Sequence, residues 1–328
     1  MPAPVPLVEV VRSGLVESVH HGSLVALDAS GQSVIDLGAT RIPLFPRSAT
    51  KPLQAVGMLR AGLDLDRDLD GADLAIAAAS HNGEPAHVRQ VRALLVRAGL
   101  DADALACPAD LPLGEPARAD VLRNGGGPDR VYMNCSGKHA AMLLTCVQKG
   151  WPITAYDAVD HPLQQAIRAA VEDLAGETAA AVGIDGCGVP IYALSLIGLA
   201  AAYRRLVTAE SGSAERSVAD AMRAHPHLVA GTGREDSVLM ATVPGLLMKG
   251  GAEGVHAAAL ETGAVVACKV DDGAARARLP AMVWALHRLG VPADRLAGAP
   301  VEPVLGGGRP VGEVRVRADV IHDLLDTP

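Results

Sequence analysis

Ser48 and Lys51 lie three residues apart in the segment RSATKPLQA, residues 47–55. On a helix, side chains at positions i and i+3 point to the same side, so the lysine amine reaches the serine hydroxyl. A buried lysine whose charge is disfavoured becomes a base that takes the serine proton. The spacing therefore predicts a nucleophile with its base, against the alternative of a helix-capping serine followed by a surface lysine.

Two further segments carry a second hydroxyl and a second amine. Ser80 ends the apolar, strand-like run DLAIAAAS, residues 73–80, and opens the segment SHNGEP. Lys249 begins KGGAEG, residues 249–254, which resembles the KTG element that faces the Ser-x-x-Lys helix in serine β-lactamases and penicillin-binding proteins. A serine in a turn and a solvated lysine are the alternatives when each segment is taken alone. Taken with Ser48 and Lys51, these residues predict one site with two serines and two lysines.

A cluster of metal-binding side chains is predicted from two other segments. Cys135, Lys138 and His139 share one face of the expected helix in MNCSGKHAAML, residues 133–143. Cys187 stands between two glycines in DGCGVP, residues 185–190. Two thiolates and a nitrogen donor suit Zn²⁺, although the spacing matches no common zinc finger. Buried, unreactive cysteines are the alternative.

The composition favours a protein that acts on a small molecule. The 328 residues carry a formal net charge of -8 and no cluster of Lys and Arg, so we expect no nucleic acid partner. The five cysteines form no CxxC pair and the N-terminus has no signal-peptide pattern, so we expect a cytoplasmic protein with reduced thiols. The longest uncharged run, residues 186–203, is interrupted by Gly and Pro and predicts a buried helix rather than a membrane span.

Positioning these side chains requires both strands and helices. Alternating patterns predict strands at residues 7–14, 15–22, 23–29, 33–38, 254–260, 264–270 and 312–320. Helical periodicity predicts helices at residues 48–63, 85–100, 136–150, 161–176, 190–206, 214–226 and 275–290. Strands at both ends of the chain predict an α+β fold, with one antiparallel sheet built from the N- and C-terminal strands. We expect a single domain over residues 1–328, with a helical part at roughly 84–225.

The segments quoted above occur in the same order in a known family. RSATKPLQA, SHNGEP, NCSGKHAAML, DGCGVP and KGGAEG resemble those of the thermolabile L-asparaginase II family, and the resemblance runs from about residue 8 to about residue 320. It implies a fold like that of the serine β-lactamases and penicillin-binding proteins and, usually, a homodimer. It also implies hydrolysis of L-asparagine to L-aspartate and ammonia.

The resemblance further implies a role for individual residues of this chain. The catalytic residues are two Ser–Lys tandems, Ser48 with Lys51 and Ser80 with Lys249. The zinc ligands are Cys135, Lys138 and Cys187. The resemblance also places Asp185 beside the metal ligands, and we count it among the candidates for binding the substrate. Arg47 and His139 are the other candidates, chosen because a free amino acid needs both of its charged ends matched.

The expected reaction proceeds through an acyl-enzyme. Neutral Lys51 deprotonates Ser48, whose Oγ attacks the side-chain amide of asparagine. Ser80 and Lys249 relay a proton to the departing ammonia, and water then cleaves the ester. The alternatives are a penicillin-recognising or peptidase-like serine acyltransferase and a non-catalytic zinc-binding protein. The chain lacks the S-D-N element of the β-lactamases and has KGG in place of KTG, which argues against antibiotic hydrolysis.

Overall fold

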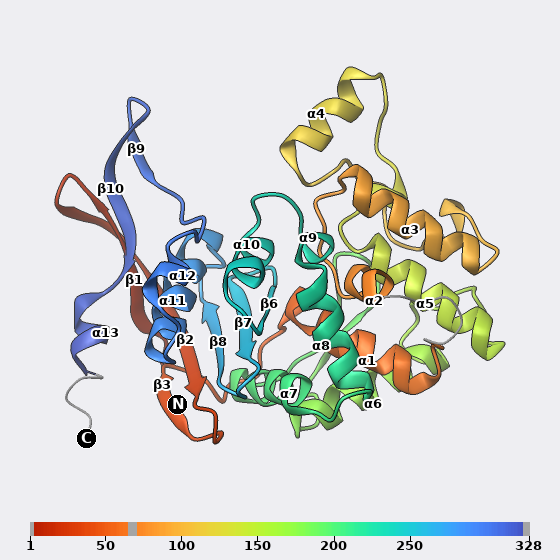
Figure 1. Ribbon diagram of the computed structural model, residues 1–328, viewed down its shortest axis with the longest axis horizontal. Helices are drawn as coiled ribbons and strands as arrows, with labels where there is room; N and C mark the ends of the chain where they lie inside the picture. Colours follow the sequence, from red (N-terminus) through yellow and green to blue (C-terminus); the bar gives the residue numbers. More distant parts are fainter. Residues whose placement is uncertain (1–2, 65–70, 324–328) are drawn as a thin grey trace.

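The computed structural model describes residues 3–64 and 71–323. It has a sheet part and a helical part, at the left and right of Figure 1. Within the described residues, one sheet contains eight strands. These are β1 (Val5–Arg12), β2 (Leu15–Leu27), β3 (Ser33–Leu37), β6 (Leu246–Gly250), β7 (Val255–Leu260), β8 (Val265–Val270), β9 (Val304–Gly306) and β10 (Arg309–Val316). The order is β6-β7-β8-β2-β1-β10-β9, with β3 paired to β2, and every pairing is antiparallel.

The two ends of the chain meet in the middle of this sheet. Val8 of β1 lies opposite Val316 of β10, and Leu24 of β2 lies opposite Cys268 of β8. The predicted α+β class, with one antiparallel sheet built from N- and C-terminal strands, is therefore confirmed.

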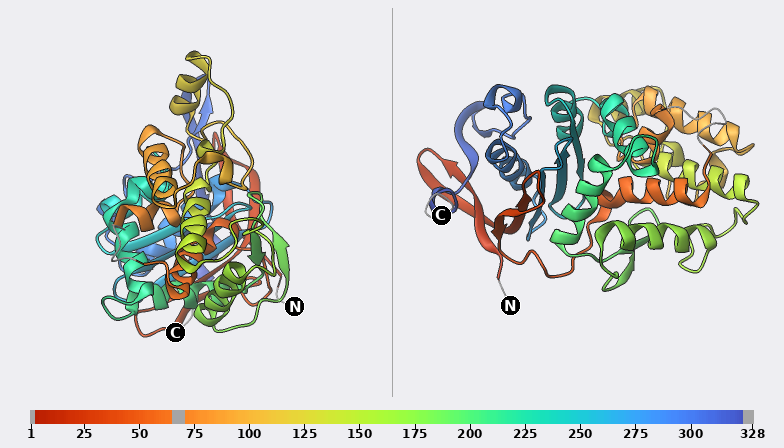
Figure 2. Two further views of the ribbon diagram at one scale, coloured as in Figure 1. Left: turned by 90° about the vertical axis from the view of Figure 1, so that its right-hand side faces the viewer. Right: turned by 60° about the horizontal axis from the view of Figure 1, so that its bottom comes forward.

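The helical part is formed mainly by the chain between β3 and β6 (Figure 1). Its helices are α1 (Lys51–Ala61), α2 (Gly71–Ala77), α3 (Pro85–Arg97), α4 (Glu115–Arg123), α5 (Ser136–Lys149), α6 (Pro162–Ala175), α7 (Leu196–Thr208), α8 (Ala214–Ala224), α9 (Pro226–Val229) and α10 (Glu235–Thr242). Short 3₁₀ turns are η1 (Arg47–Thr50), η2 (Ala102–Ala104) and η3 (Arg130–Tyr132), and a small hairpin pairs β4 (Val182–Ile184) with β5 (Pro190–Tyr192). The later helices are α11 (Ala275–Arg288), α12 (Ala293–Leu296) and α13 (Ala318–Asp323). Helix α4 projects from the body of the molecule in both Figure 1 and Figure 2.

Helices cover both faces of the central strands. Nearly every residue of β7 and β8 is buried. Because successive side chains of a strand point to opposite faces, this burial requires cover on both sides. Helices α7 and α11 both pack against β8, and Figure 2 shows them on the two sides of the sheet. The apolar core therefore continues from the sheet into the helical part, and the predicted site residues lie at this junction.

Three sequence-based predictions about elements were wrong. The run 73–80 is not strand-like: helix α2 ends at Ala77 and an irregular segment follows, because the alanine-rich sequence favours a helix. Residues 190–206 are not one helix, since β5 comes first and Ser195 then caps α7 by accepting a hydrogen bond from the Gly198 N–H. The strands predicted at residues 15–22 and 23–29 are one long strand, β2, which ends at Leu27, because Gly22 marks a close approach and not a turn. A Cβ there would lie 2.5 Å from the Lys269 carbonyl oxygen.

The helical part is also wider than the predicted range 84–225, since it runs from η1 to α10. Helices α4, α9, α10 and α12 had no sequence-based counterpart. The final strand is β10, which ends at Val316, and the predicted strand residues beyond it begin helix α13.

Candidate active site

Ser48 and Lys51 lie at the start of the predicted helix, which is confirmed as η1 followed by α1. Ser48 is half-buried in η1, and the fully buried Lys51 is the first residue of α1. Pro52 occupies the first turn of α1, where its missing N–H costs no helical hydrogen bond. Arg47, just before Ser48, has a φ of +53°, a left-handed conformation that costs a non-glycine residue about 1–3 kcal/mol. The strain lies directly beside the predicted nucleophile.

The Lys51 amine connects the first serine segment to the second. Its Nζ donates to the Ser80 hydroxyl oxygen at 2.8 Å and to the Ala79 carbonyl oxygen at 2.5 Å. Ser80 lies in the irregular segment after α2, so α1 and α2 together set this contact. Because Lys51 has only 1% of its surface exposed, the two hydrogen bonds take the place of lost hydration. The hydroxyl and the amine are positioned for proton transfer.

Lys249, the second predicted lysine, lies in β6 and has no exposed surface. Its Nζ donates to the Gly250 carbonyl oxygen at 2.8 Å and lies 3.5 Å from a carboxylate oxygen of Asp236. Asp236 also accepts hydrogen bonds from the Gly250 N–H at 3.0 Å and from His256 Nε2 at 2.7 Å. Asp236 is therefore a buried anchor for the end of the strand that carries Lys249.

The surroundings of Lys249 decide its protonation. Burial lowers the pKa of Lys249 to about 8, with the charge of Asp236 opposing and those of Lys51 and Arg234 assisting. Burial alone would raise the pKa of Asp236, but the charge of Lys249 and the hydrogen bond from His256 hold it well below its usual range. Lys249 thus has a substantial neutral fraction in mildly alkaline solution and is able to act as a base there.

A close backbone approach joins the end of β6 to the turn that carries Ser48. A Cβ on Gly251 would lie 2.5 Å from the Pro46 carbonyl oxygen and 3.2 Å from the Ala49 nitrogen. Only glycine fits this contact without a backbone shift. The last glycine of KGG therefore fixes the strand bearing Lys249 against the start of the serine helix.

The predicted metal ligands also converge. Lys138 on α5 is buried, and its Nζ lies 3.2 Å from the Cys187 sulfur. Cys187 is 3.8 Å from a carboxylate oxygen of Asp185, whose other oxygen binds Arg47 Nε at 2.8 Å. A chain of contacts thus runs from Arg47, beside the predicted nucleophile, to the helix that carries Lys138.

The pKa values of the two thiols in the cysteine cluster are shifted in opposite directions. The pKa of Cys187 is lowered to about 5, mainly by its side-chain interaction with Cys135, whose thiol also lies 3.0 Å from the Asn134 amide oxygen. Burial opposes this shift of Cys187, and the charge of Lys138 assists it. The same interaction and burial raise the pKa of Cys135. Burial would lower the pKa of Lys138, but the sulfurs of Cys187 and Cys135 and the carboxylate of Asp185 outweigh it and raise that pKa. Two sulfurs and an amine in one buried cluster are a donor set that suits Zn²⁺. A bound Zn²⁺ would displace the protons of the thiols and of the amine.

His139 is fully buried one residue after Lys138. Burial and the charge of Lys138 lower its pKa to about 3, so the ring is neutral at ordinary pH. Its Nδ1 lies 2.6 Å from the Tyr156 hydroxyl, which already accepts the Ala106 N–H at 2.9 Å. With the Tyr156 proton directed at Nδ1, the ring proton lies on Nε2, which has no hydrogen-bond partner within residues 3–64 and 71–323. An unpaired buried donor of this kind is costly unless a ligand accepts from it.

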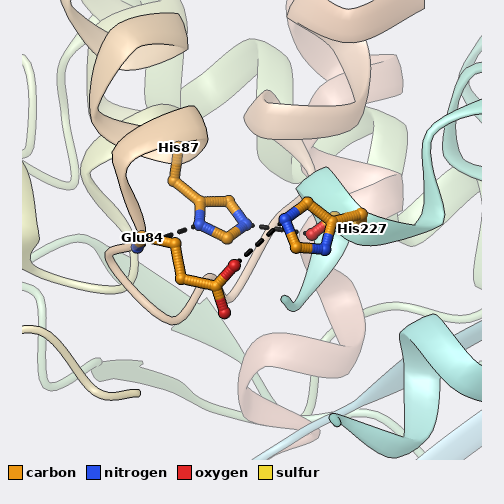
Figure 3. Close-up of side chains that lie close together, drawn as sticks. All are labelled: Glu84, His87 and His227. Atoms are coloured by element: carbon orange, nitrogen blue, oxygen red, sulfur yellow. Dashed lines mark hydrogen bonds and ion pairs between the residues drawn. The ribbon is translucent and has the colours of Figure 1, made fainter. Parts of the chain in front are cut away.

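A second polar cluster, Glu84, His87 and His227, is shown in Figure 3. His87 Nδ1 accepts the Glu84 N–H at 3.1 Å, and its Nε2 donates to the His227 carbonyl oxygen at 2.9 Å. Both nitrogens of His87 are thus committed, which leaves no lone pair for a metal. Glu84 Oε2 lies 3.0 Å from His227 Nε2. The cluster ties the start of α3 to α9.

Among the residues in or beside the candidate site, sequence reasoning missed Asp236, His256, Tyr156 and Arg234. The charged run RED, residues 234–236, precedes the strand that carries Lys249 and was the available signal for Asp236 and Arg234. His256 and Tyr156 reach the site only through the tertiary fold, so their positions in the sequence carry no signal.

With this geometry established, comparison with known proteins is informative. The chain matches the family described as L-asparaginase II over residues 8–316, nearly its whole length. It belongs to the L-asparaginase II family. Membership supports an asparaginase function in general, which is an amidohydrolase reaction. A comparison with individually curated proteins gave no match. Within residues 3–64 and 71–323, no helix of this L-asparaginase II family member is long and apolar enough to span a membrane.

Proposed function

We propose that this chain hydrolyses L-asparagine to L-aspartate and ammonia with a Ser–Lys mechanism. One observation carries the proposal: the buried Lys51 amine is hydrogen-bonded to Ser80 at 2.8 Å and stands at the start of the helix whose preceding turn holds Ser48. Family membership supports the asparaginase reaction, and the buried hydroxyl–amine contact supports the chemistry.

In the proposed reaction, neutral Lys51 takes the proton of Ser48 as Oγ attacks the side-chain amide carbon of asparagine. The tetrahedral intermediate collapses, the C–N bond breaks, and the nitrogen leaves as ammonia after receiving a proton through Ser80. Water then attacks the ester carbonyl and loses a proton to a neutral lysine, Lys51 or Lys249. The C–O bond breaks, L-aspartate is released, and Ser48 regains its proton.

His139 is proposed to bind the substrate as a hydrogen-bond donor. The unpaired Nε2 proton supports this role, because an amide or carboxylate oxygen of the substrate would satisfy it. Arg47 and Asp185 are bonded to each other at 2.8 Å. Their predicted contact with the charged ends of the substrate therefore requires this pair to open or to be shared.

Zn²⁺ is proposed as the bound metal, with Cys135, Lys138 and Cys187 as its ligands. It would supply Lewis-acid polarisation of a substrate oxygen beside the serines. We further propose a cytoplasmic homodimer, as the family resemblance implies.

The experiment compares ammonia release from L-asparagine, L-glutamine and a β-lactam, the last followed by ring opening. Wild-type protein should act on asparagine, and Ser48→Ala and Lys51→Met should each lose more than about tenfold in kcat, over 1.4 kcal/mol of barrier, with unchanged circular dichroism. β-Lactam opening without asparagine hydrolysis would favour the penicillin-recognising alternative. No turnover of any substrate with stoichiometric zinc would favour a zinc-binding protein.

A further inference from the structure

A cavity of about 580 Å³ opens beside the segment that carries Ser80. Asn82, Glu84 and Arg234 line it, together with residues near the start of α4. The Ser80 N–H donates to the Val229 carbonyl oxygen at 2.9 Å, and the Asn82 N–H donates to the Ala230 carbonyl oxygen at 2.8 Å. The serine segment and the segment leading to Arg234 are therefore bonded side by side.

The guanidinium of Arg234 has few partners for its five N–H donors. Nη1 donates to the Asn82 amide oxygen at 3.2 Å, and Nε lies 3.8 Å from a Glu235 carboxylate oxygen, beyond hydrogen-bond range. A quarter of the side chain, 25%, is exposed, and Arg234 is one of the residues that line the cavity. By contrast, Arg47 binds Asp185 at 2.8 Å, and Arg278 is bonded to Glu235 and to the Gly251 carbonyl oxygen. Within the described residues, the side chains of Arg47 and Arg234 each make one hydrogen bond, but only that of Arg234 goes to a neutral amide and not to a carboxylate. Arg234 is therefore the one of these three arginines with no carboxylate in hydrogen-bond contact.

The loop that carries Arg234 is held rigidly. Asn82 Nδ2 donates to the Thr232 carbonyl oxygen at 3.2 Å, and a carboxylate oxygen of Glu84 accepts the Thr232 N–H at 2.8 Å. A Cβ on Gly231, whose φ is +119°, would lie 2.6 Å from the Asn82 amide nitrogen. The segment therefore packs directly on Asn82, and a fixed guanidinium loses little entropy when it binds a carboxylate.

The separation between Ser80 and Asn82 is close to the length of an amino acid substrate. Ser80 and Asn82 are two residues apart in a non-helical segment, a separation of about 6.6 Å when extended. In L-asparagine, the amide carbon lies about 4 Å from the α-carboxyl carbon, and a hydrogen bond to an arginine adds about 3 Å. A substrate with its amide carbon beside Ser80 is therefore long enough to reach Asn82, whose amide oxygen accepts a hydrogen bond from Arg234. The acidic Glu84 and Glu115 also line the cavity, so it offers both signs of charge to a zwitterion.

We propose that Arg234, aligned by Asn82, binds the α-carboxylate of the substrate and sets the preference for a free amino acid. This inference rests on the proposed function. It assigns the carboxylate contact to Arg234 rather than to Arg47.

The test compares L-asparagine with L-asparaginol, in which a CH₂OH group replaces the α-carboxylate. In Arg234→Gln, kcat/KM for asparagine should fall by about 10- to 100-fold, mostly through KM, because a charged hydrogen-bonded pair is lost. The rate on asparaginol should stay within about twofold of wild type, and Arg234→Lys should be intermediate for asparagine because it keeps the charge without the fork. Arg216→Gln, which removes an exposed arginine paired with Asp220 on α8, is the matched control and should change neither rate.

An equal loss on both substrates, or a selective loss in Arg47→Gln in place of Arg234→Gln, would overturn the assignment. Thermal melting of each variant identifies a folding defect, and Arg234→Lys covers the case in which Arg234→Gln does not fold. If wild-type protein hydrolyses neither substrate, the proposed function fails. Calorimetric titration of unhydrolysed L-asparagine, whose α-carboxylate is its one carboxylate, into wild type and Arg234→Lys then tests the contact separately. Weaker binding to the variant supports the contact, and equal binding refutes it.

Discussion

Replacing Asp236 with asparagine changes one buried charge beside Lys249 and little else. Asparagine has the same shape, and its amide oxygen is able to keep accepting from the Gly250 N–H or from His256. The carboxylate stabilises the ammonium form of Lys249, so its removal favours the neutral amine. The pKa of Lys249 should therefore fall below its value of about 8.

The distance sets the size of the effect. At an effective dielectric constant of about 20, unit charges separated by the observed 3.5 Å interact by about 5 kcal/mol, equivalent to a fall of about 3 in pKa. This is an upper bound, because the Gly250 N–H and His256 share the carboxylate charge. We expect the pKa of Lys249 to fall by at least about 1, to about 7 or lower.

The assay is kcat/KM for asparagine between pH 5 and 10 at constant ionic strength. In wild type, activity should rise with pH through about 8 as Lys249 loses its proton, and in Asp236→Asn the rise should occur at lower pH. Asp73→Asn on α2 is the matched control, since that carboxylate is equally buried and bonds Gln90 and Arg97 far from Lys249 in the sequence. If Asp236→Asn is folded and its activity rises over the same pH range as that of wild type, Lys249 is not the titrating base.

Three further outcomes are expected. His139→Gln should raise KM several-fold without changing the shape of the profile between pH 5 and 10, because the pKa of His139 is about 3; a limb near pH 6.5 that disappears in this variant would indicate a histidine base. Elemental analysis of untagged wild type should find bound zinc, and Cys187→Ser should lose it. A zinc content below about a tenth of an equivalent in wild type would leave the cysteines as buried thiols. Gly251→Ala should destabilise the protein by about 1–3 kcal/mol in denaturant unfolding and reduce activity, since its Cβ would lie 2.5 Å from a carbonyl oxygen. Gly127→Ala, with nothing within 4 Å, should do neither, and equal effects of the two glycine substitutions would contradict the close-approach interpretation.

Local patterns were sufficient for much of the fold. The helix at residues 48–63 was predictable because Pro52 in the first turn and the Gly at position 62 mark its two ends. The hairpin between β2 and β3 was equally clear from its turn residues. The element predictions failed where tertiary contacts override local preference, as at Gly22, which resembles a turn residue but lies in a strand beside the Lys269 carbonyl.

The site was predictable to the extent that its residues stand in short segments. Lys138 and Cys187 were named from their surroundings in the sequence, and the fold brings them to 3.2 Å. The partner of the Lys51 amine was not given by spacing, because the hydrogen bond to Ser80 depends on how α2 ends beside α1. Arg234 approaches Asn82 only through the pairing of two irregular segments, and single-sequence patterns do not describe such contacts.

The pairing of β1 with β10 has a consequence for how the protein is made. Strands β1 and β2 leave the ribosome early, but their partners β10 and β8 follow only after most of the chain has been synthesised. At about 5–20 residues per second, the intervening chain takes roughly 15–60 seconds. During that interval the early hairpin exposes unpaired strand edges and an apolar face, the features that promote aggregation of nascent chains. Lys249 also lies on a late strand, so the nascent chain acquires its full set of candidate catalytic groups only after β6 has been synthesised and docked on η1.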